Sequence, residues 1–178
     1  MVDWKWVRPG ETEALEQIRA LFVEYQAELG VDLCFQSFQE ELDSLPGAYS
    51  APTGALLAGE ASGQIVACGA LRSIADGTCE LKRIYVRPGF RGLRLGEKIC
   101  IELMKCGREL GYRNVRLDTL RRLVPAGRMY EKLGFAEIEP YNFNPEPDIV
   151  YLERGLDADL RLDPEPDDRP HEGRAGGG

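Results

Sequence analysis

The residues best suited to chemistry lie between Glu80 and Lys98, where a glycine-containing loop follows a hydrophobic strand pattern. Between residues 82 and 98, six Lys and Arg side chains face a single acid, although the whole chain has a formal net charge of −8. A helix is expected to begin in this stretch, and the positive end of a helix dipole ordinarily favours acidic side chains. Cations gathered there indicate either a bound anion or a solvated basic turn.

The loop itself, Arg91-Gly-Leu-Arg-Leu-Gly96, has the residue types of a phosphate cradle. N–H groups that precede a helix lack intrahelical partners, and a pyrophosphate can satisfy them. Gly92 and Gly96 permit close approach, and Arg91 and Arg94 can add charge-assisted hydrogen bonds. No Gly-Lys-Ser/Thr follows the loop, which disfavours a nucleoside triphosphate.

The single histidine, His171, lies in a polar tail, and this removes several kinds of chemistry. It excludes Ser–His and Cys–His pairs and an imidazole-built zinc site. The five cysteines form no CxxC pair and are expected to be reduced, buried hydrophobes. We therefore expect no metal, and a carboxylate is the natural general base.

Hydrophobic periodicity and turn residues predict the elements that must position this loop. We expect helices over residues 12–29, 37–45, 93–110 and 126–133, and strands over 2–8, 55–59, 65–74, 79–86, 115–119, 136–139 and 149–153. Ser37, with Glu40 three residues later, predicts a capping box at the start of the second helix. The order of elements indicates a mixed α/β fold, with a mainly antiparallel central sheet flanked by helices, rather than a doubly wound parallel sheet.

Length and composition predict one domain over residues 1–155, followed by an acidic, Pro- and Gly-rich tail at 156–178 that we expect to be disordered. No stretch reaches the roughly 18 apolar residues of a membrane span, and the N-terminus lacks a signal-peptide pattern. We therefore expect a cytoplasmic protein that does not bind membranes. The acidic charge balance argues against nucleic acid as a partner. The sequence leaves the oligomeric state open, including a homodimer.

Two motifs together resemble those of the GNAT superfamily of acyl-CoA-dependent N-acetyltransferases. The first is the loop above, in which Arg91 and Gly96 match the family pattern and Arg94 replaces its middle glycine. The second, Ala126-Gly-Arg-Met-Tyr-Glu-Lys-Leu-Gly-Phe135, is similar to the family's Ala-x-x-x-Tyr-x-x-x-Gly-Phe segment. The element order over residues 2–153 also agrees. The resemblance implies a GNAT-like fold with acetyl-CoA as co-substrate.

Two positions depart from the family pattern. Leu123 stands where many members have Asn, which removes one side-chain hydrogen bond to the pantetheine arm. Arg94 stands in place of glycine, so we expect a right-handed backbone there, with Cβ directed away from the phosphates. Its guanidinium would then add a contact to the coenzyme.

The resemblance also implies roles for individual residues. Tyr130 occupies the position of the family tyrosine that protonates the departing thiolate. Backbone N–H groups at residues 84–86 would polarise the thioester carbonyl as an oxyanion hole does. The residues expected to bind the coenzyme are Ile84, Tyr85, Val86, Arg91, Gly92, Leu93, Arg94, Leu95, Gly96, Glu97, Asp118, Ala126, Met129 and Lys132.

Glu80 is the expected general base, because it lies eleven positions before Arg91, as in GNAT enzymes with a glutamate base on this strand. An amine of pKa about 10.4 is unprotonated in only about one molecule in 2,500 at pH 7. A positioned base therefore contributes about 10²–10⁴-fold to the rate. The alternative is a surface carboxylate that pairs with Lys82.

The implied function is transfer of acetyl from acetyl-CoA to a primary amine of a small molecule, by direct attack within a ternary complex. The acceptor pocket is expected to involve the loops at 30–38 and 141–144, with plain aromatic packing as the alternative. Glu28 and Asp32 would suit a cationic amine, while Asp118 faces either the acceptor or the pantetheine. Acetylation of protein amines and a non-catalytic acyl-CoA-binding or sensing domain remain the competing functions.

Overall fold

The computed structural model describes residues 1–31 and 37–157. Predictions that concern Asp32, Cys34, His171 or the tail at 158–178 lie outside these residues. The packed core includes Leu156, which is buried one residue beyond the predicted domain boundary.

The elements follow the predicted order closely. The strands are β1 (Asp3–Trp6), β2 (Ala55–Ala61), β3 (Gln64–Ala75), β4 (Thr78–Val86), β5 (Asn114–Leu120), β6 (Ala136–Ile138) and β7 (Ile149–Gly155). The helices are α1 (Thr12–Leu29), α2 (Phe38–Ser44), α3 (Leu95–Glu109) and α4 (Val124–Lys132), with short 3₁₀ turns at Gly47–Tyr49 and Pro88–Phe90. The seven strands form one sheet in the order β1-β2-β3-β4-β5-β7-β6. All pairs are antiparallel except β4 with β5, so the predicted mixed, mainly antiparallel α/β fold is confirmed.

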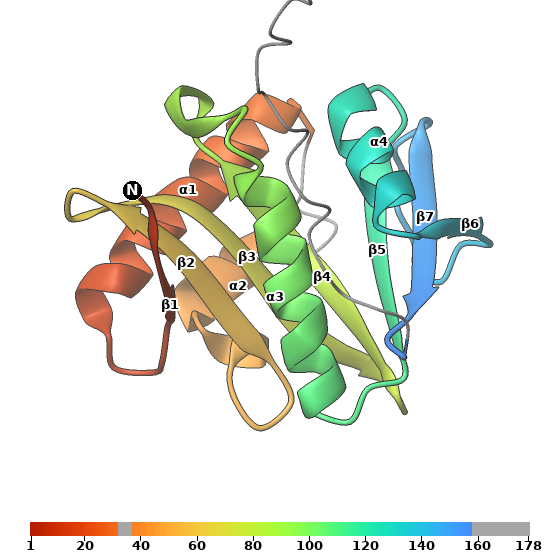
Figure 1. Cartoon of the computed structure of the whole chain (residues 1–178), viewed down its shortest axis with the longest axis horizontal. Coiled ribbons are helices and arrows are strands. Elements are labelled where there is room, and N and C mark those ends of the chain that lie inside the picture. The colour runs from red at the N-terminus through yellow and green to blue at the C-terminus, as the bar shows by residue number, and fades with distance from the viewer. Residues whose placement is uncertain (32–36, 158–178) are drawn as a thin grey trace, which may run out of the picture.

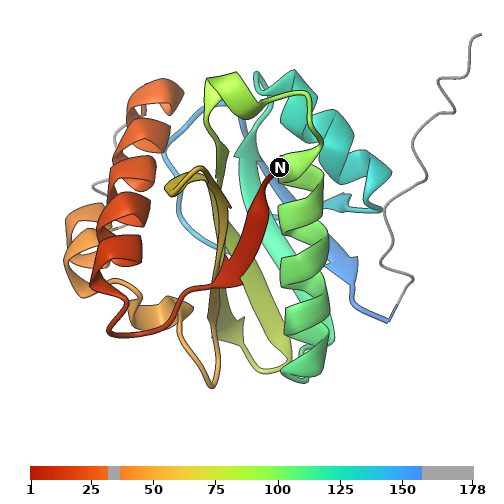
Figure 2. The same cartoon turned by 60° about the vertical axis from the view of Figure 1, so that its left-hand side comes forward.

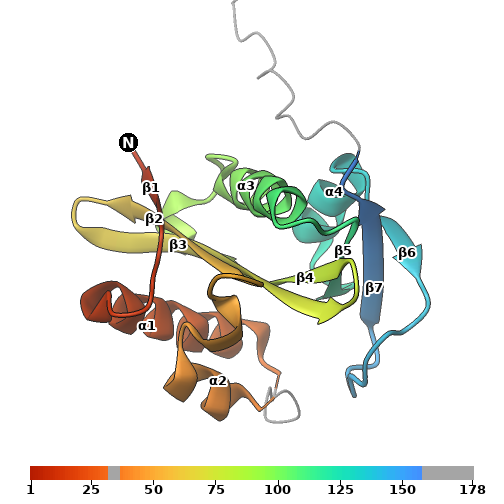
Figure 3. The same ribbon diagram turned by 90° about the horizontal axis from the view of Figure 1, so that it is seen from below.

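Helices cover both faces of the sheet, with α1 and α2 on one face and α3 and α4 on the other (Figures 2 and 3). Ile18, Leu21 and Phe22 share the buried stripe of α1, as their three- and four-residue spacing predicts. Ile99 and Leu103 do the same for α3. The sheet therefore separates two hydrophobic clusters, one under each pair of helices.

Strands β4 and β5 stay together only at their N-terminal ends, where Thr78–Glu80 pairs with residues 114–116. Beyond this point the two ribbons diverge towards their C-terminal ends (Figure 1). A bulge in β4 accompanies the divergence, because Arg83 has a positive φ of 57° and the register against β3 shifts between Cys68 and Ala70. Gly69 faces this bulge, and a Cβ there would lie 2.3 Å from Ile99 Cγ2, so glycine lets α3 pack closely on β3.

The predicted capping box at the second helix is wrong. Ser37 has a left-handed backbone (φ 53°, ψ 43°), and its side chain makes no capping hydrogen bond. Capping by a Ser side chain requires an extended backbone at that residue, which explains why the sequence pattern misled. Glu40 is exposed in the first turn of α2.

Candidate active site

The loop before α3 presents its backbone as an anion cradle. Gly92 has φ +83°, Arg94 is left-handed, and α3 begins at Leu95 without a side-chain cap. The first intrahelical bond runs from the Lys98 N–H to the Arg94 carbonyl at 3.1 Å, so the N–H groups of residues 95–97 precede the helical ladder. Nothing lies within 4 Å of a Cβ built on Gly92, which leaves open space over the loop. These donors at a helix N-terminus fit a phosphate or pyrophosphate group.

The expectation of a right-handed backbone at Arg94 is wrong. Its φ of 54° and ψ of 22° lie in the left-handed region, which costs a residue other than glycine about 1–2 kcal/mol. Its guanidinium hydrogen bonds to both Glu97 oxygens, with Nε–Oε2 at 2.9 Å and NH2–Oε1 at 2.8 Å. This hydrogen bond lowers the pKa of Glu97. Arg94, at the position where the family pattern has glycine, therefore hydrogen bonds to Glu97 in the first turn of α3.

Folding neutralises much of the basic stretch, because α1 supplies acids that are distant in sequence. Arg87 binds Glu24 in a bidentate pair, and Arg91 binds Glu28 with both NH2–oxygen distances at 2.7 Å. Glu28 therefore pairs with Arg91 when the cradle is empty. The Arg91–Glu28 pair is half exposed, and such pairs are worth about 0–1 kcal/mol. An anion in the cradle can therefore attract Arg91 at little cost.

The divergence of β4 and β5 encloses a cavity of about 100 Å³. Residues 81–84 of β4 and 117–120 of β5 form its two walls. Tyr25 and Leu29 of α1 close one side, and Ala126 and Tyr130 of α4 close the other. Past Glu80, β5 no longer pairs with β4, so the predicted N–H donors of Ile84 and Val86 belong to a segment that β5 leaves uncovered.

Tyr130 reaches this cavity as a buried neutral phenol. Its side chain is 7% exposed, and burial raises the pKa of its hydroxyl well above 10. The ring packs edge-to-face on Phe135, with 5.7 Å between ring centroids. Within the described chain its hydroxyl has no hydrogen-bonded protein partner, so it keeps a proton that it can donate.

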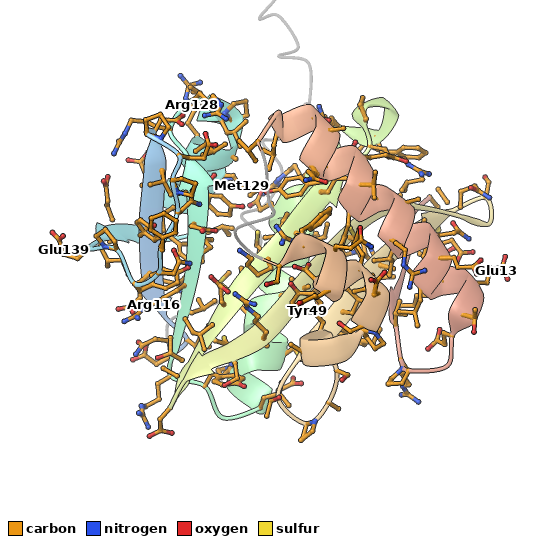
Figure 4. All side chains as sticks on the ribbon, turned by 180° about the vertical axis from the view of Figure 1, so that it is seen from behind. Glu13, Tyr49, Arg116, Arg128, Met129 and Glu139 are labelled. Atoms are coloured by element: carbon orange, nitrogen blue, oxygen red, sulfur yellow. The ribbon has the colours of Figure 1, made fainter. Side chains whose placement is uncertain are left out.

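Glu80 is fully buried at the end of the paired part of β4 and does not line the cavity. Its two carboxylate oxygens accept hydrogen bonds from Arg72 Nε at 2.7 Å and from the Tyr141 hydroxyl at 2.9 Å. The Arg116 guanidinium carbon lies 5.3 Å from the centroid of the Tyr141 ring, and Figure 4 labels Arg116 on β5. The alternative interpretation, a surface carboxylate paired with Lys82, is wrong. The role of Glu80 as the general base stays a prediction.

Lys82 instead reaches across the opening to β5. Its Nζ lies 3.5 Å from Asp118 Oδ1, and the two side chains are 5% and 10% exposed. Asn144 Nδ2 donates to Asp118 Oδ2 at 3.4 Å, which brings the loop between β6 and β7 to the same carboxylate. The cavity therefore contains a buried cation and a buried anion side by side.

The acetyltransferase (GNAT) family model matches residues 15–135, which is more than half of the chain. The chain belongs to the GNAT family. An uncharacterized N-acetyltransferase of Schizosaccharomyces pombe is 41% identical to it over 140 residues, covering 78% of this chain and 86% of that protein. The family model and this relative together identify the GNAT protein as an acetyltransferase.

Solved structures share its fold. An acetyltransferase of Streptococcus agalactiae has a TM-score of 0.73 at 22% identity, covering 86% of this chain and 98% of the other. The PaiA N-acetyltransferase of Thermoplasma acidophilum, solved with coenzyme A, has a TM-score of 0.65 at 18% identity, covering 87% and 99%.

The structure groups the residues expected from the GNAT motifs around two places. The loop residues 91–97 surround the α3 N-terminus, and Met129 lies beside it, since a Cβ on Gly96 would meet Met129 Sδ at 3.5 Å. Lys132 joins this group through Glu97 Oε1 at 3.6 Å. Ile84, Asp118, Ala126 and Tyr130 line the cavity. Tyr85 stands apart, because its ring packs against Tyr25 and its hydroxyl donates to Glu28.

The cavity residues of this GNAT protein that were missed include Lys82, Tyr25 and Arg83. Lys82 shares a strand face with Glu80, two residues away, which the alternation of the strand could have indicated. Tyr25 belongs to the apolar stripe of α1 and looked like a core residue. No sequence pattern indicated that Arg83 lines the cavity, because its position depends on the bulge in β4.

Among the described residues, no helix is long and apolar enough to span a bilayer. In the same part of the chain, no cluster of three or more His, Cys, Asp or Glu could hold a metal ion.

Proposed function

We propose that this GNAT protein transfers the acetyl group of acetyl-CoA to a primary amine of a small molecule, by direct attack within a ternary complex. The observation that carries the proposal is the position of Tyr130, a buried neutral phenol in the cavity where β4 and β5 diverge. The anion cradle at the α3 N-terminus follows β4 in the chain and contacts α4, the helix that carries Tyr130. A cavity of about 100 Å³, smaller than the roughly 150 Å³ site that accepts benzene, supports a small acceptor group.

The residues present fit the coenzyme. The N–H groups of the loop at 91–97 would hold the pyrophosphate, with Arg91 available after exchange from Glu28. Ala126, Met129 and Lys132 of α4 would flank the arm, and the N–H groups of residues 84–86 would polarise the acyl carbonyl. Bound acetyl-CoA supplies the thioester, whose acyl carbon is the electrophile.

We assign the proton transfers to two side chains. Tyr130 donates its phenolic proton to the leaving sulfur, which its raised pKa permits because it stays protonated at pH 7. Glu80 is the proposed base, and its place outside the cavity requires a relay through the Tyr141 hydroxyl or a water. A ternary complex needs no covalent enzyme intermediate, because both reactants meet in one cavity. A cytoplasmic location and a possible homodimer are further parts of the proposal.

The test is coenzyme A thiol release with acetyl-CoA and a panel of small primary amines, with product identified by mass spectrometry. The proposal expects turnover of at least one small amine and thermal stabilisation by acetyl-CoA. Stabilisation without turnover of any amine, free or on a peptide, would instead support a sensing domain. Turnover of peptide amines alone would overturn the small-molecule acceptor.

Glu80→Gln tests the base. If Glu80 accepts the proton, this variant loses the acidic limb of the pH–rate profile that the wild type shows. A limb that persists in the variant assigns the base to another group.

A further inference from the structure

Two acids of α1 bind the two arginines that lead into the cradle. Glu24 binds Arg87, and Glu28, four residues later, binds Arg91 with both of its oxygens 2.7 Å from the same NH2 group. The two arginines lie in different places. Arg87 directly follows β4, whereas Arg91 is the first residue of the loop at 91–97 that forms the cradle. One arginine of the cradle is therefore bonded to an acid of α1.

Glu28 lies in the last turn of α1, where a negative side chain is unfavourable. The negative end of a helix dipole favours cations in the last turn, and α1 has no basic residue there. Glu24 stands four residues before Glu28, and like charges at this spacing destabilise a helix. Arg91 is the cation that compensates Glu28. When Arg91 leaves, this end of α1 becomes a favourable place for another cation.

A phosphate in the cradle competes with Glu28 for Arg91. The side chains of Arg91 and Glu28 are 45% and 46% exposed, and exposed pairs of this kind are weak. Arg91 Nε donates to the Val86 carbonyl at 3.0 Å, which keeps the guanidinium beside the loop while its NH2 group changes partner. A pyrophosphate also binds the N–H groups at the α3 N-terminus, which the carboxylate of Glu28 does not. Coenzyme binding therefore takes Arg91 from Glu28.

The released carboxylate lies at the α1 side of the cavity between β4 and β5. Tyr25 and Leu29 of α1 line that cavity. Glu28 follows Tyr25 by three residues, and residues three apart are neighbours on the surface of a helix. The Tyr85 hydroxyl donates to Glu28 Oε2 at 3.4 Å, and the Tyr85 ring packs on Tyr25 with 5.9 Å between ring centroids. These contacts keep Glu28 beside Tyr25 after Arg91 has left.

Resting on the proposed function, we propose that Glu28 is an ion-pair switch that couples the two substrates. When the cradle is empty, Glu28 holds Arg91 and opposes the binding of coenzyme phosphate. When the pyrophosphate binds Arg91, Glu28 receives a cationic group of the acceptor in place of the guanidinium. This cationic group is not the amine that is acetylated, because the attacking amine must be neutral. The acceptor class is therefore a small amine with a second positive charge, and the two substrates strengthen each other's binding.

The exchange is tested by the binding of coenzyme A to the full-length protein, measured by calorimetry. Glu28→Gln should tighten binding about three- to five-fold, because it removes the competitor for Arg91 and an exposed pair is worth up to about that factor. In an Arg91→Gln background, Glu28→Gln should have no effect on the affinity. A Glu28→Gln variant that binds coenzyme A no more tightly than the wild type would overturn the switch.

The matched control is Glu24→Gln, which makes the same change of charge one helical turn away. It frees Arg87, which lies outside the cradle, so the affinity for coenzyme A should change less than about two-fold, through screened long-range charge alone. An equal gain of affinity in both α1 variants would overturn the exchange, since net charge would then explain it. A thermal melt of each variant establishes that it is folded.

The acceptor half of the switch is tested by steady-state kinetics at saturating acetyl-CoA. Diamines are compared with the amino alcohols of equal length, which lack the second charge. The wild type should favour the diamine at least about five-fold in kcat/KM, mainly through KM, and Glu28→Gln should lose this preference although it binds coenzyme A more tightly. A wild type that uses both acceptors equally, or a preference that survives in Glu28→Gln, would overturn the role of Glu28 toward the acceptor.

These results separate the switch from the proposed function. If no amine is acetylated and Glu28→Gln still tightens coenzyme A binding, the transfer reaction is refuted and the exchange of Arg91 is supported. If amines are acetylated and the affinity for coenzyme A is the same in Glu28→Gln and the wild type, the proposed function is supported and the switch is refuted. A wild type that does not bind coenzyme A would refute both.

Discussion

The ion pair between Arg83 and Glu41 joins α2 to the bulge of β4, and its removal should destabilise the protein strongly. The two side chains are only 3% and 13% exposed. Arg83 Nε and NH2 donate to the two Glu41 oxygens at 2.8 Å and 2.7 Å, and the Tyr49 hydroxyl donates to Oε1 at 2.9 Å. The guanidinium carbon also lies 5.1 Å from the centroid of the Phe38 ring. Figure 4 labels Tyr49 on the α2 side of the sheet.

Glu41→Gln removes the negative charge and turns one acceptor oxygen into an NH2 group that faces the guanidinium. Breaking a buried pair from one side costs about 3–5 kcal/mol. At the low end, about 3 kcal/mol, the melting temperature of a chain of this size should fall by roughly 6–12 °C. Urea unfolding followed by circular dichroism measures the free energy directly.

The matched control is Glu102→Gln, which breaks an ion pair with Lys105 on the surface of α3. Because that pair is exposed, the control should change stability by less than about 1 kcal/mol. A Glu41→Gln variant that unfolds within 0.5 kcal/mol of the wild type would refute the reasoning, since burial would then give the pair no special weight.

Three further predictions concern packing, pH and the loop. Gly69→Ala should cost about 1–3 kcal/mol in urea unfolding, because its Cβ would lie 2.3 Å from Ile99 Cγ2; an unchanged midpoint would show that α3 can shift freely. The pKa of Glu41 is lowered in the folded state, against its burial, by the Arg83 hydrogen bond. Its stabilisation is therefore full above the ordinary carboxyl pKa of 4.5 and is lost as the pH falls through the lowered folded-state value. Glu41→Gln should show a weaker loss of stability between pH 6 and pH 3 than the wild type, and parallel curves would contradict this. Arg94→Gly removes the backbone strain of a left-handed non-glycine residue, which is about 1 kcal/mol. The affinity for acetyl-CoA, measured by calorimetry, should stay within about three-fold of the wild type. A larger loss of affinity would make Arg94 a phosphate ligand.

Local patterns predicted most of the fold. The apolar spacing of α1 and α3 and the turn at Gly77 each produced the expected element, because these signals depend on neighbours in sequence. Ser37 failed because its side chain could cap α2 only from an extended backbone, which the chain does not adopt there. The bulge at Arg83 could not be predicted, since it depends on how β4 pairs with β3.

The candidate site was predictable where a motif fixes it and not where distant charges meet. Tyr130 and the loop at 91–97 were found from their motifs, and the structure places them around the cavity and the α3 N-terminus. Residues 82–98 contain six cations and one acid in the sequence. In the folded protein this excess of positive charge is smaller, because Glu24 and Glu28 of α1 pair with Arg87 and Arg91. The Lys82–Asp118 contact joins two strands separated by a helix, so no local pattern could reveal it.

The central claim is that Tyr130 delivers the proton that completes acetyl transfer from acetyl-CoA to an amine in this cavity. Its most direct test is the rate of acetylated product formation, measured by mass spectrometry, in Tyr130→Phe against the wild type. Positioned acids contribute about 10²–10⁴-fold. We therefore predict that kcat falls by about 10²-fold or more while the dissociation constant of acetyl-CoA stays within about two-fold. An unchanged kcat in Tyr130→Phe would contradict the account.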